Sequence, residues 1–212
     1  GGHRKTTPEA LRFVEMALKG RVNGALVQLF NSGGQRAVGL SGKDGRMVTA
    51  VRRIHTEITE GIETQHDLGR VGDVASVDTT LLSMLLDRGY IPVVACIAAD
   101  ARGEDYNINA DMFAGHLAGA LKADRYLVLT DVDGVLTDIN DPSSLVGRMS
   151  VAELQGMMGT VIVGGMIPKL ESCRIALQHG AAEARIMNGM KPEHLRIAAA
   201  GEACGTTIVT EV

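Results

Sequence analysis

The chain contains Tyr126-Leu127-Val128-Leu129-Thr130-Asp131-Val132-Asp133-Gly134, an apolar run that ends in an acidic turn. A run of consecutive apolar side chains is typical of a parallel strand that is covered on both of its faces. A second run of this kind occupies residues 91–97, and a helical pattern at residues 109–121 separates the two. Two buried strands with a helix between them predict a βαβ unit and therefore a parallel sheet.

Strands and helices alternate on both sides of this unit. Helical spacing of apolar residues indicates helices at residues 8–18, 22–30, 78–86, 109–121, 150–158, 168–179 and 192–200. Short apolar runs indicate strands at residues 37–40, 47–51, 91–97, 126–129, 184–187 and 206–210. The predicted fold is α/β: a three-layer α-β-α sandwich with a mainly parallel central sheet, formed by residues 1–212 as a single domain.

Residues 37–51 have the pattern of a β-hairpin. Two apolar runs flank the turn Ser41-Gly42-Lys43-Asp44-Gly45. This turn lacks the spacing of a Walker phosphate loop, and strands rather than a strand and a helix flank it, so we do not interpret it as a phosphate site. The polar, glycine-containing residues 52–74 that follow predict short strands and loops.

Composition excludes several classes of protein. The chain has 212 residues, of which 45% are hydrophobic, and its formal net charge is −4. That balance favours a protein with a sizeable core and disfavours a nucleic-acid binder or a membrane-surface protein. Its three cysteines, Cys96, Cys173 and Cys204, are odd in number and widely spaced, which indicates neither a disulfide framework nor a zinc site.

The apolar runs and the first residues of the chain predict where the protein is located and which part of a longer protein it represents. The apolar runs are too short to span a membrane and no signal peptide opens the chain, so the prediction is a cytoplasmic protein. The sequence begins Gly1-Gly2-His3 without a methionine. We therefore expect it to be the later part of a longer protein.

Polar residues follow the strand predicted at residues 91–97. Ligands bind parallel sheets beyond the carboxyl ends of the strands, where Asn107, Asn109 and Asp111 are expected to lie. In one interpretation Asn109 caps the following helix and Asp111 compensates its dipole. In the other, the carboxamides grip a ligand carboxylate and Asp111 positions cationic groups.

The acidic turn at residues 131–134 also has two interpretations. It is either a tight turn or a nucleotide loop whose backbone N–H groups meet ribose or phosphate. An EF-hand is excluded because Pro142 stands where that loop needs its twelfth-position glutamate. The histidines show no metal-ligand spacing, and no metal site is predicted.

Lys169 ends the run Gly164-Gly165-Met166-Ile167-Pro168-Lys169, which predicts the first turn of a helix. A positive charge is disfavoured there, because the helix N-terminus is itself positive. Lys169 is either a solvated surface lysine or the partner of a bound anion. A phosphate at this helix start, with Lys169 on its oxygens, would suit phosphoryl transfer.

These motifs, taken together and in order, resemble the amino-acid kinase family, and within it the acetylglutamate kinases. The resemblance covers essentially the whole chain. It rests on residues 38–45, 69–74, 89–94, 107–111, 130–136, 164–169 and 205–208. It implies a carbamate kinase-like fold and an enzyme that uses MgATP to phosphorylate the γ-carboxylate of N-acetyl-L-glutamate in arginine or ornithine biosynthesis. It also implies a homo-oligomer, a dimer or higher.

The resemblance also assigns roles to residues. Arg4 is implied to bind the α-carboxylate of the substrate, together with Asn107 and Asn109, while Asp111 organises the catalytic lysines and Lys169 stabilises the transferring phosphoryl group. The implied nucleotide-binding residues are Asp131, Val132, Asp133, Gly134, Val135, Leu136, Val161, Ile162 and Val163. The substrate side would lie mainly in residues 1–106 and the nucleotide side mainly in residues 107–212.

The chain departs from the family pattern at its beginning. The family's lysine–glycine–glycine loop and its histidine–glycine-rich loop are not present, and Lys5 stands where the family has an apolar residue. We therefore expect these 212 residues alone to be inactive in phosphoryl transfer. Two alternatives stay open: a sister kinase that acts on an aminoadipate-type carboxylate, possibly on a carrier protein, and a non-catalytic nucleotide-binding module.

Overall fold

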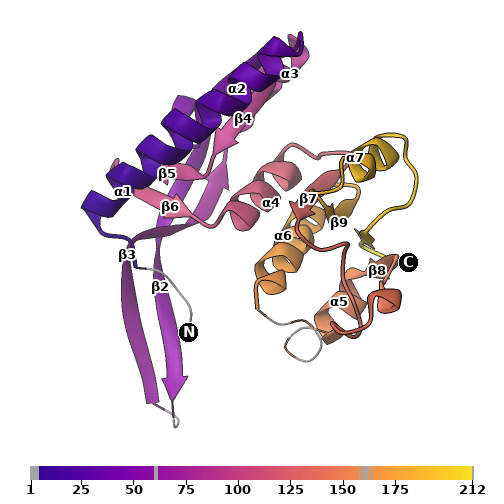
Figure 1. The fold of residues 1–212 in the computed structure, drawn as a ribbon. Helices are drawn as coiled ribbons and strands as arrows, with labels where there is room; N and C mark the ends of the chain where they lie inside the picture. The colour runs from indigo at the N-terminus through magenta and orange to yellow at the C-terminus, as the bar shows by residue number, and fades with distance from the viewer. Residues whose placement is uncertain (1–4, 60–61, 158, 160–161, 163, 212) are drawn as a thin grey trace. The chain divides into compact units, whose positions relative to one another are not determined.

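The computed structural model describes residues 5–59, 62–157, 159, 162 and 164–211. The chain forms two compact units, Gly1–Phe113 and Ala114–Val212 (Figure 1). This division lies close to the one predicted at residues 106/107 between a substrate side and a nucleotide side. The functional meaning of the division stays a prediction.

The first unit opens with a long helix. Thr7 caps α1 (Pro8–Glu15), because its Oγ1 accepts a hydrogen bond of 3.1 Å from the backbone N–H of Ala10. The helix continues through a π-helical segment (Met16–Val22) into α2 (Asn23–Ser32). It ends where Gly34 adopts a φ of +82°, which glycine reaches without steric cost.

The hairpin predicted for residues 37–51 is wrong. β1 (Ala37–Ser41) pairs in parallel with β4 (Ile91–Ala95), and α3 (Thr80–Asp87) precedes β4. A 3-10 turn (Asp44–Arg46) instead carries the chain from β1 into a different sheet. The apolar run at residues 91–97 is likewise split at Cys96, because β5 (Ile97–Ala99) joins that other sheet. Local sequence indicates strands and turns, but it does not determine which strands pair.

The short strands and loops predicted for residues 52–74 are also wrong. β2 (Val48–Thr59) and β3 (Ile62–Val77) form a long antiparallel hairpin, which projects beyond the rest of the first unit (Figure 1). With β5 and β6 (Asp105–Ile108) the hairpin closes a small barrel. Its distal part has no clear alternation of apolar and polar residues, because neither face there covers a core. Cross-strand pairs of side chains such as Arg52–Asp67 stabilise the pairing of the two strands instead.

The second unit contains a four-stranded sheet in the order β7-β9-β10-β8. Its strands are β7 (Tyr126–Thr130), β8 (Arg148–Ser150), β9 (Ala184–Asn188) and β10 (Thr206–Val209). Its helices are α4 (Ala110–Ala120, which begins in the first unit), α5 (Val151–Met157), α6 (Met166–Gln178) and α7 (Pro192–Ala199), with a 3-10 turn at Pro142–Ser144. As predicted, Ser150 and Glu153 form a capping box at α5.

The core of the second unit lies between the sheet and α6. Leu154, Leu170, Ile186 and Ile208 are completely buried there. Gly115 allows α4 to approach α6 closely, since a Cβ at this position would lie 2.5 Å from the backbone oxygen of Ser172.

The predicted α/β class and the mainly parallel pairing are confirmed. Five of the eight strand pairings among the described residues are parallel: β1–β4, β2–β5, β3–β6, β7–β9 and β8–β10. The described strands form a parallel pair, a small barrel and a four-stranded sheet rather than one continuous sheet. Within the described residues, no helix is both long and apolar enough to cross a bilayer.

Candidate nucleotide and substrate sites

The acidic turn after β7 is held in place by neighbouring strands. The backbone N–H of Val135 donates to Thr206 Oγ1 at 2.8 Å, and that hydroxyl donates to the carbonyl of Val146 at 2.7 Å. Gly134 lies against the same threonine, and a Cβ on it would come within 2.6 Å of Thr206 Oγ1. The loop therefore needs a glycine at this point.

An apolar cavity lies beside this loop. It has a volume of about 100 Å³. Its lining residues are Val132, Gly134, Val135, Leu136, Ile139, Ile162 and Met166. The structure thus brings together at one cavity two of the segments implied to bind nucleotide. Val161 and Val163 lie outside the described residues. Since pockets for whole drug-sized ligands measure about 300–1,000 Å³, this one suits a single apolar part of a ligand, such as a planar ring.

The two carboxylates of the loop have different surroundings. Asp131 is exposed and accepts a hydrogen bond of 3.1 Å from Thr130 Oγ1. Asp133 instead accepts from Asn188 Nδ2 at 2.8 Å and from Lys191 Nζ at 2.8 Å. Lys191 first, and then Asn188, hold the pKa of Asp133 below its usual value. Sequence reasoning missed both partners, since Lys191 stands 58 residues away and reads as the start of a helix.

Lys169 lies near the start of α6, the helix whose first residue, Met166, lines the cavity. The prediction that Pro168 opens this helix is wrong by two residues: Gly165 is the N-cap and Pro168 is the third helical residue. Lys169 is therefore fourth, at the end of the first turn, and it is half-buried. Its carbonyl accepts from Ser172 Oγ at 2.6 Å.

The residues implied to bind substrate belong to the first unit. Asn107 is a half-buried residue of β6, between Val71 of β3 and Ile97 of β5. Asn109 caps α4, because its Oδ1 accepts from the N–H of Met112 at 3.1 Å. The predicted cap is thus confirmed, and a role of Asn109 in binding substrate stays a prediction. Asp111 lies in the first turn of α4. Arg4 lies outside the described residues. The cooperation of Asp111 with Lys169 stays a prediction.

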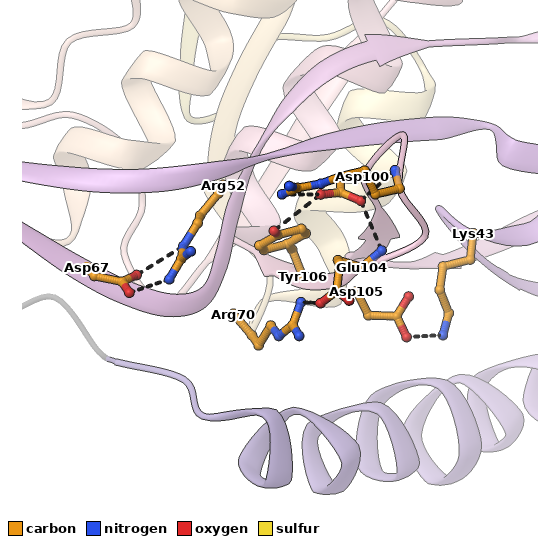
Figure 2. Close-up of polar contacts among 9 residues, drawn as sticks. Lys43, Arg52, Asp67, Arg70, Asp100, Glu104, Asp105 and Tyr106 are labelled. Carbon is orange, nitrogen blue, oxygen red and sulfur yellow. Dashed lines mark hydrogen bonds and ion pairs between the residues drawn. The ribbon is translucent and has the colours of Figure 1, made fainter.

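A charged hollow of about 510 Å³ lies elsewhere in the first unit, between the β2–β3 hairpin and residues 102–106. Arg52 pairs with Asp67 across the hairpin, and Arg70 pairs with Glu104 (Figure 2). Tyr106 also lines this hollow, and alternate residues of a strand point to opposite faces. Asn107 therefore belongs to the other face of β6. The hairpin residues of this hollow fall in the segment for which the sequence predicted short strands and loops.

The sequence profile of the amino acid kinase family matches residues 2–188. The acetylglutamate kinase of Methanocaldococcus jannaschii is 47% identical over 92% of this chain and 65% of its own length. That of Methanococcus maripaludis strain C7 is 41% identical over 99% of this chain and 72% of its own length. The chain therefore spans about two thirds of the length of these relatives.

A solved structure supports the fold assignment. The N-acetylglutamate synthase of Neisseria gonorrhoeae, complexed with coenzyme A and N-acetylglutamate, superposes with a TM-score of 0.81. The match covers 100% of this chain and 46% of that one, with 22% sequence identity. At this identity the likeness supports the fold alone.

Proposed function

The chain belongs to the amino acid kinase family, and from that premise we propose that the complete protein phosphorylates the γ-carboxylate of N-acetyl-L-glutamate with ATP. The observation that carries the proposal is the identity of 41–47% to acetylglutamate kinases over 92–99% of the chain. The product would be an acyl phosphate used in arginine or ornithine biosynthesis, made in the cytoplasm where ATP is available.

Such a reaction requires the protein mainly to position the two reactants and to neutralise negative charge. A substrate carboxylate is already a competent nucleophile, so no general base is required. Catalysis then rests on holding the two reactants in line and on neutralising charge at the transferring phosphoryl group. The proposed residues for these tasks are Lys169 on the phosphoryl oxygens, Asp111 as the organiser of lysines, and Arg4, Asn107 and Asn109 on the acceptor.

The nucleotide would bind with its apolar part in the cavity beside residues 132–136 and its phosphates toward the start of α6. Helix N-termini attract phosphate through their free N–H groups and dipole. Mg²⁺ would neutralise charge on the phosphates. The metal would arrive with ATP, because kinase Mg²⁺ is held largely by the phosphates of the substrate.

Acetylglutamate-dependent release of ADP by the complete protein is the direct test of this function. We expect turnover with N-acetyl-L-glutamate and Mg²⁺, detected in a coupled assay, and none when the acceptor is omitted. Turnover only with an aminoadipate-type acceptor, free or attached to a carrier protein, would instead indicate the sister kinase. Binding of an ATP analogue without turnover on either acceptor would indicate a non-catalytic nucleotide-binding module.

We also propose that the protein is a homo-oligomer. Large apolar side chains are exposed along the first helix, notably Phe13 (68%) and Leu29 (69%). Met16, Val22, Leu26 and Phe30 on the same helix are exposed as well. Exposed apolar side chains that gather in a patch are typical of surfaces that another protein covers. We expect light scattering to give a dimer or larger species, and Phe13→Ser with Leu29→Ser to shift it toward the monomer. Met84→Ser on α3, also exposed, is the matched control and should leave the mass unchanged.

A further inference from the structure

We propose that Lys191 and Asn188 are positioning residues for the nucleotide: they clamp Asp133 and so hold the loop whose apolar side lines the cavity. This inference rests on the proposed ATP site and assigns to it two residues that lie 55 and 58 positions after Asp133 in the chain, at and just beyond the end of the neighbouring strand. It also removes Asp133 from the set of direct nucleotide ligands and makes it the anchor of the loop.

The first step of the argument is the direction of Asp133. Val132 and Gly134, its two neighbours, line the cavity, whereas Asp133 is not among the lining residues. Both of its carboxylate oxygens are already engaged by the protein. Oδ1 lies 2.8 Å from Asn188 Nδ2 and 2.7 Å from Lys191 Nζ, and Oδ2 lies 2.8 Å from the same Nζ.

The second step is the rigidity of the clamp. Asn188 ends β9, is only 8% exposed, and pairs in register with Thr130, the last residue of β7. Its Oδ1 accepts from the N–H of Met190 at 2.9 Å, which directs the amide nitrogen to Asp133. Gly189 N–H donates to the Thr130 carbonyl at 2.8 Å. The clamp is therefore fixed to the strand from which the loop departs.

The third step is that the loop is held at both ends. Asp133 is clamped from β9 and the start of α7, while Thr206 of β10 holds Val135. Between these anchors, Gly134 presents backbone to the cavity. A loop fixed in this way needs no reordering when a ligand arrives, and preorganisation improves affinity by lowering the cost of ordering.

The fourth step concerns charge. Asp131 and Asp133 place two carboxylates in a loop that is proposed to meet a polyanion. Like charges in close approach oppose binding, and the ammonium of Lys191 offsets the charge of Asp133. Removal of Lys191 would thus loosen the loop and also expose an uncompensated negative charge beside the nucleotide.

The test is calorimetry with a non-hydrolysable ATP analogue, together with steady-state kinetics of the complete protein. Lys191→Met is expected to raise the Kd of the analogue and the KM for ATP by about three- to tenfold, since the ion pair is half-exposed. The kcat and the KM for N-acetyl-L-glutamate should stay within about twofold. Lys122→Met removes the same charge from an exposed site in the same unit and should change neither quantity.

Further variants distinguish a role of Asp133 in holding the loop from direct contact of Asp133 with the nucleotide. Asp133→Asn in the Lys191→Met background should recover part of the affinity, because a neutral amide no longer repels the phosphates. Lys191→Arg should retain the wild-type value. An unchanged ATP affinity in Lys191→Met, or Asp133→Asn alone weakening binding more than Lys191→Met does, would overturn the inference. If the wild-type protein bound no ATP analogue, the proposed function would fall, and this inference with it.

Discussion

Replacing Lys169 by alanine is expected to lower the kcat of the complete protein by about a hundredfold or more. Its ammonium is proposed to act on the transferring phosphoryl group, whose equatorial oxygens carry negative charge in the transition state. An interaction made mainly in the transition state lowers kcat when it is removed, but it hardly changes the binding of the acceptor. The KM for N-acetyl-L-glutamate should therefore stay within about twofold, as measured in the ADP-release assay.

The position of Lys169 supports so large an effect. It is half-buried in the first turn of α6, the helix whose first residue, Met166, lines the apolar cavity. Lys122→Ala, an exposed lysine of the same unit, serves as the control for loss of one positive charge. A kcat for Lys169→Ala equal to that of this control would show that the phosphoryl group is neutralised elsewhere.

Gly205→Ala is expected to destabilise the protein by about 2–5 kcal/mol. Gly205 adopts a φ of +66°, which costs an L-residue about 1–2 kcal/mol. The added Cβ would also lie 2.2 Å from the carbonyl oxygen of Ile186 and 2.8 Å from the Cβ of Met187, both in β9. Relief of these contacts requires β10 to move away from β9, which disturbs the centre of the sheet.

A matched glycine separates the two causes. Gly201 has a φ of +82°, but the nearest atom to its added Cβ is Arg125 Nη2, at 3.5 Å. Gly201→Ala should therefore show only the conformational cost of about 1–2 kcal/mol. Urea unfolding of both variants measures the difference. Equal losses of stability would mean that the close approach of Gly205 to Ile186 relaxes without cost.

Much of the local structure could be predicted because its causes are local. Thr7 and Pro8 begin α1, Ser150 and Glu153 begin α5, and Asn109 begins α4, each through hydrogen bonds that span only three residues. Side-chain capping of this kind is encoded within a few positions of the sequence. The apolar run at residues 126–129 likewise became a strand of the second unit's sheet.

The pairing of strands could not be predicted in the same way. The turn at residues 41–45 is compatible with a hairpin, yet β1 pairs with β4, more than fifty residues later in the chain. Residues 52–74 form much of a long hairpin although their pattern is polar, since exposed strands need no apolar alternation. Register and partner depend on which surfaces become buried together, and no short window of sequence contains both partners.

In the candidate nucleotide site, too, some features could be predicted from the local sequence and others depend on tertiary contacts. The sequence alone predicted the α/β class, the acidic turn at the end of an apolar strand, and Lys169 close to a helix start. It also predicted that this strand is covered on both faces, which is wrong, because β7 is an edge strand of the described sheet and Leu129 is 48% exposed. Only the tertiary structure decided that residues 132–136 share a cavity with Ile162, and that Asp133 is held by Asn188 and Lys191. Composition and short-range hydrogen bonds determine whether a segment forms a helix, a strand or a turn. Contacts between residues 26 to 58 positions apart arise only when the sheet brings the ends of its strands together.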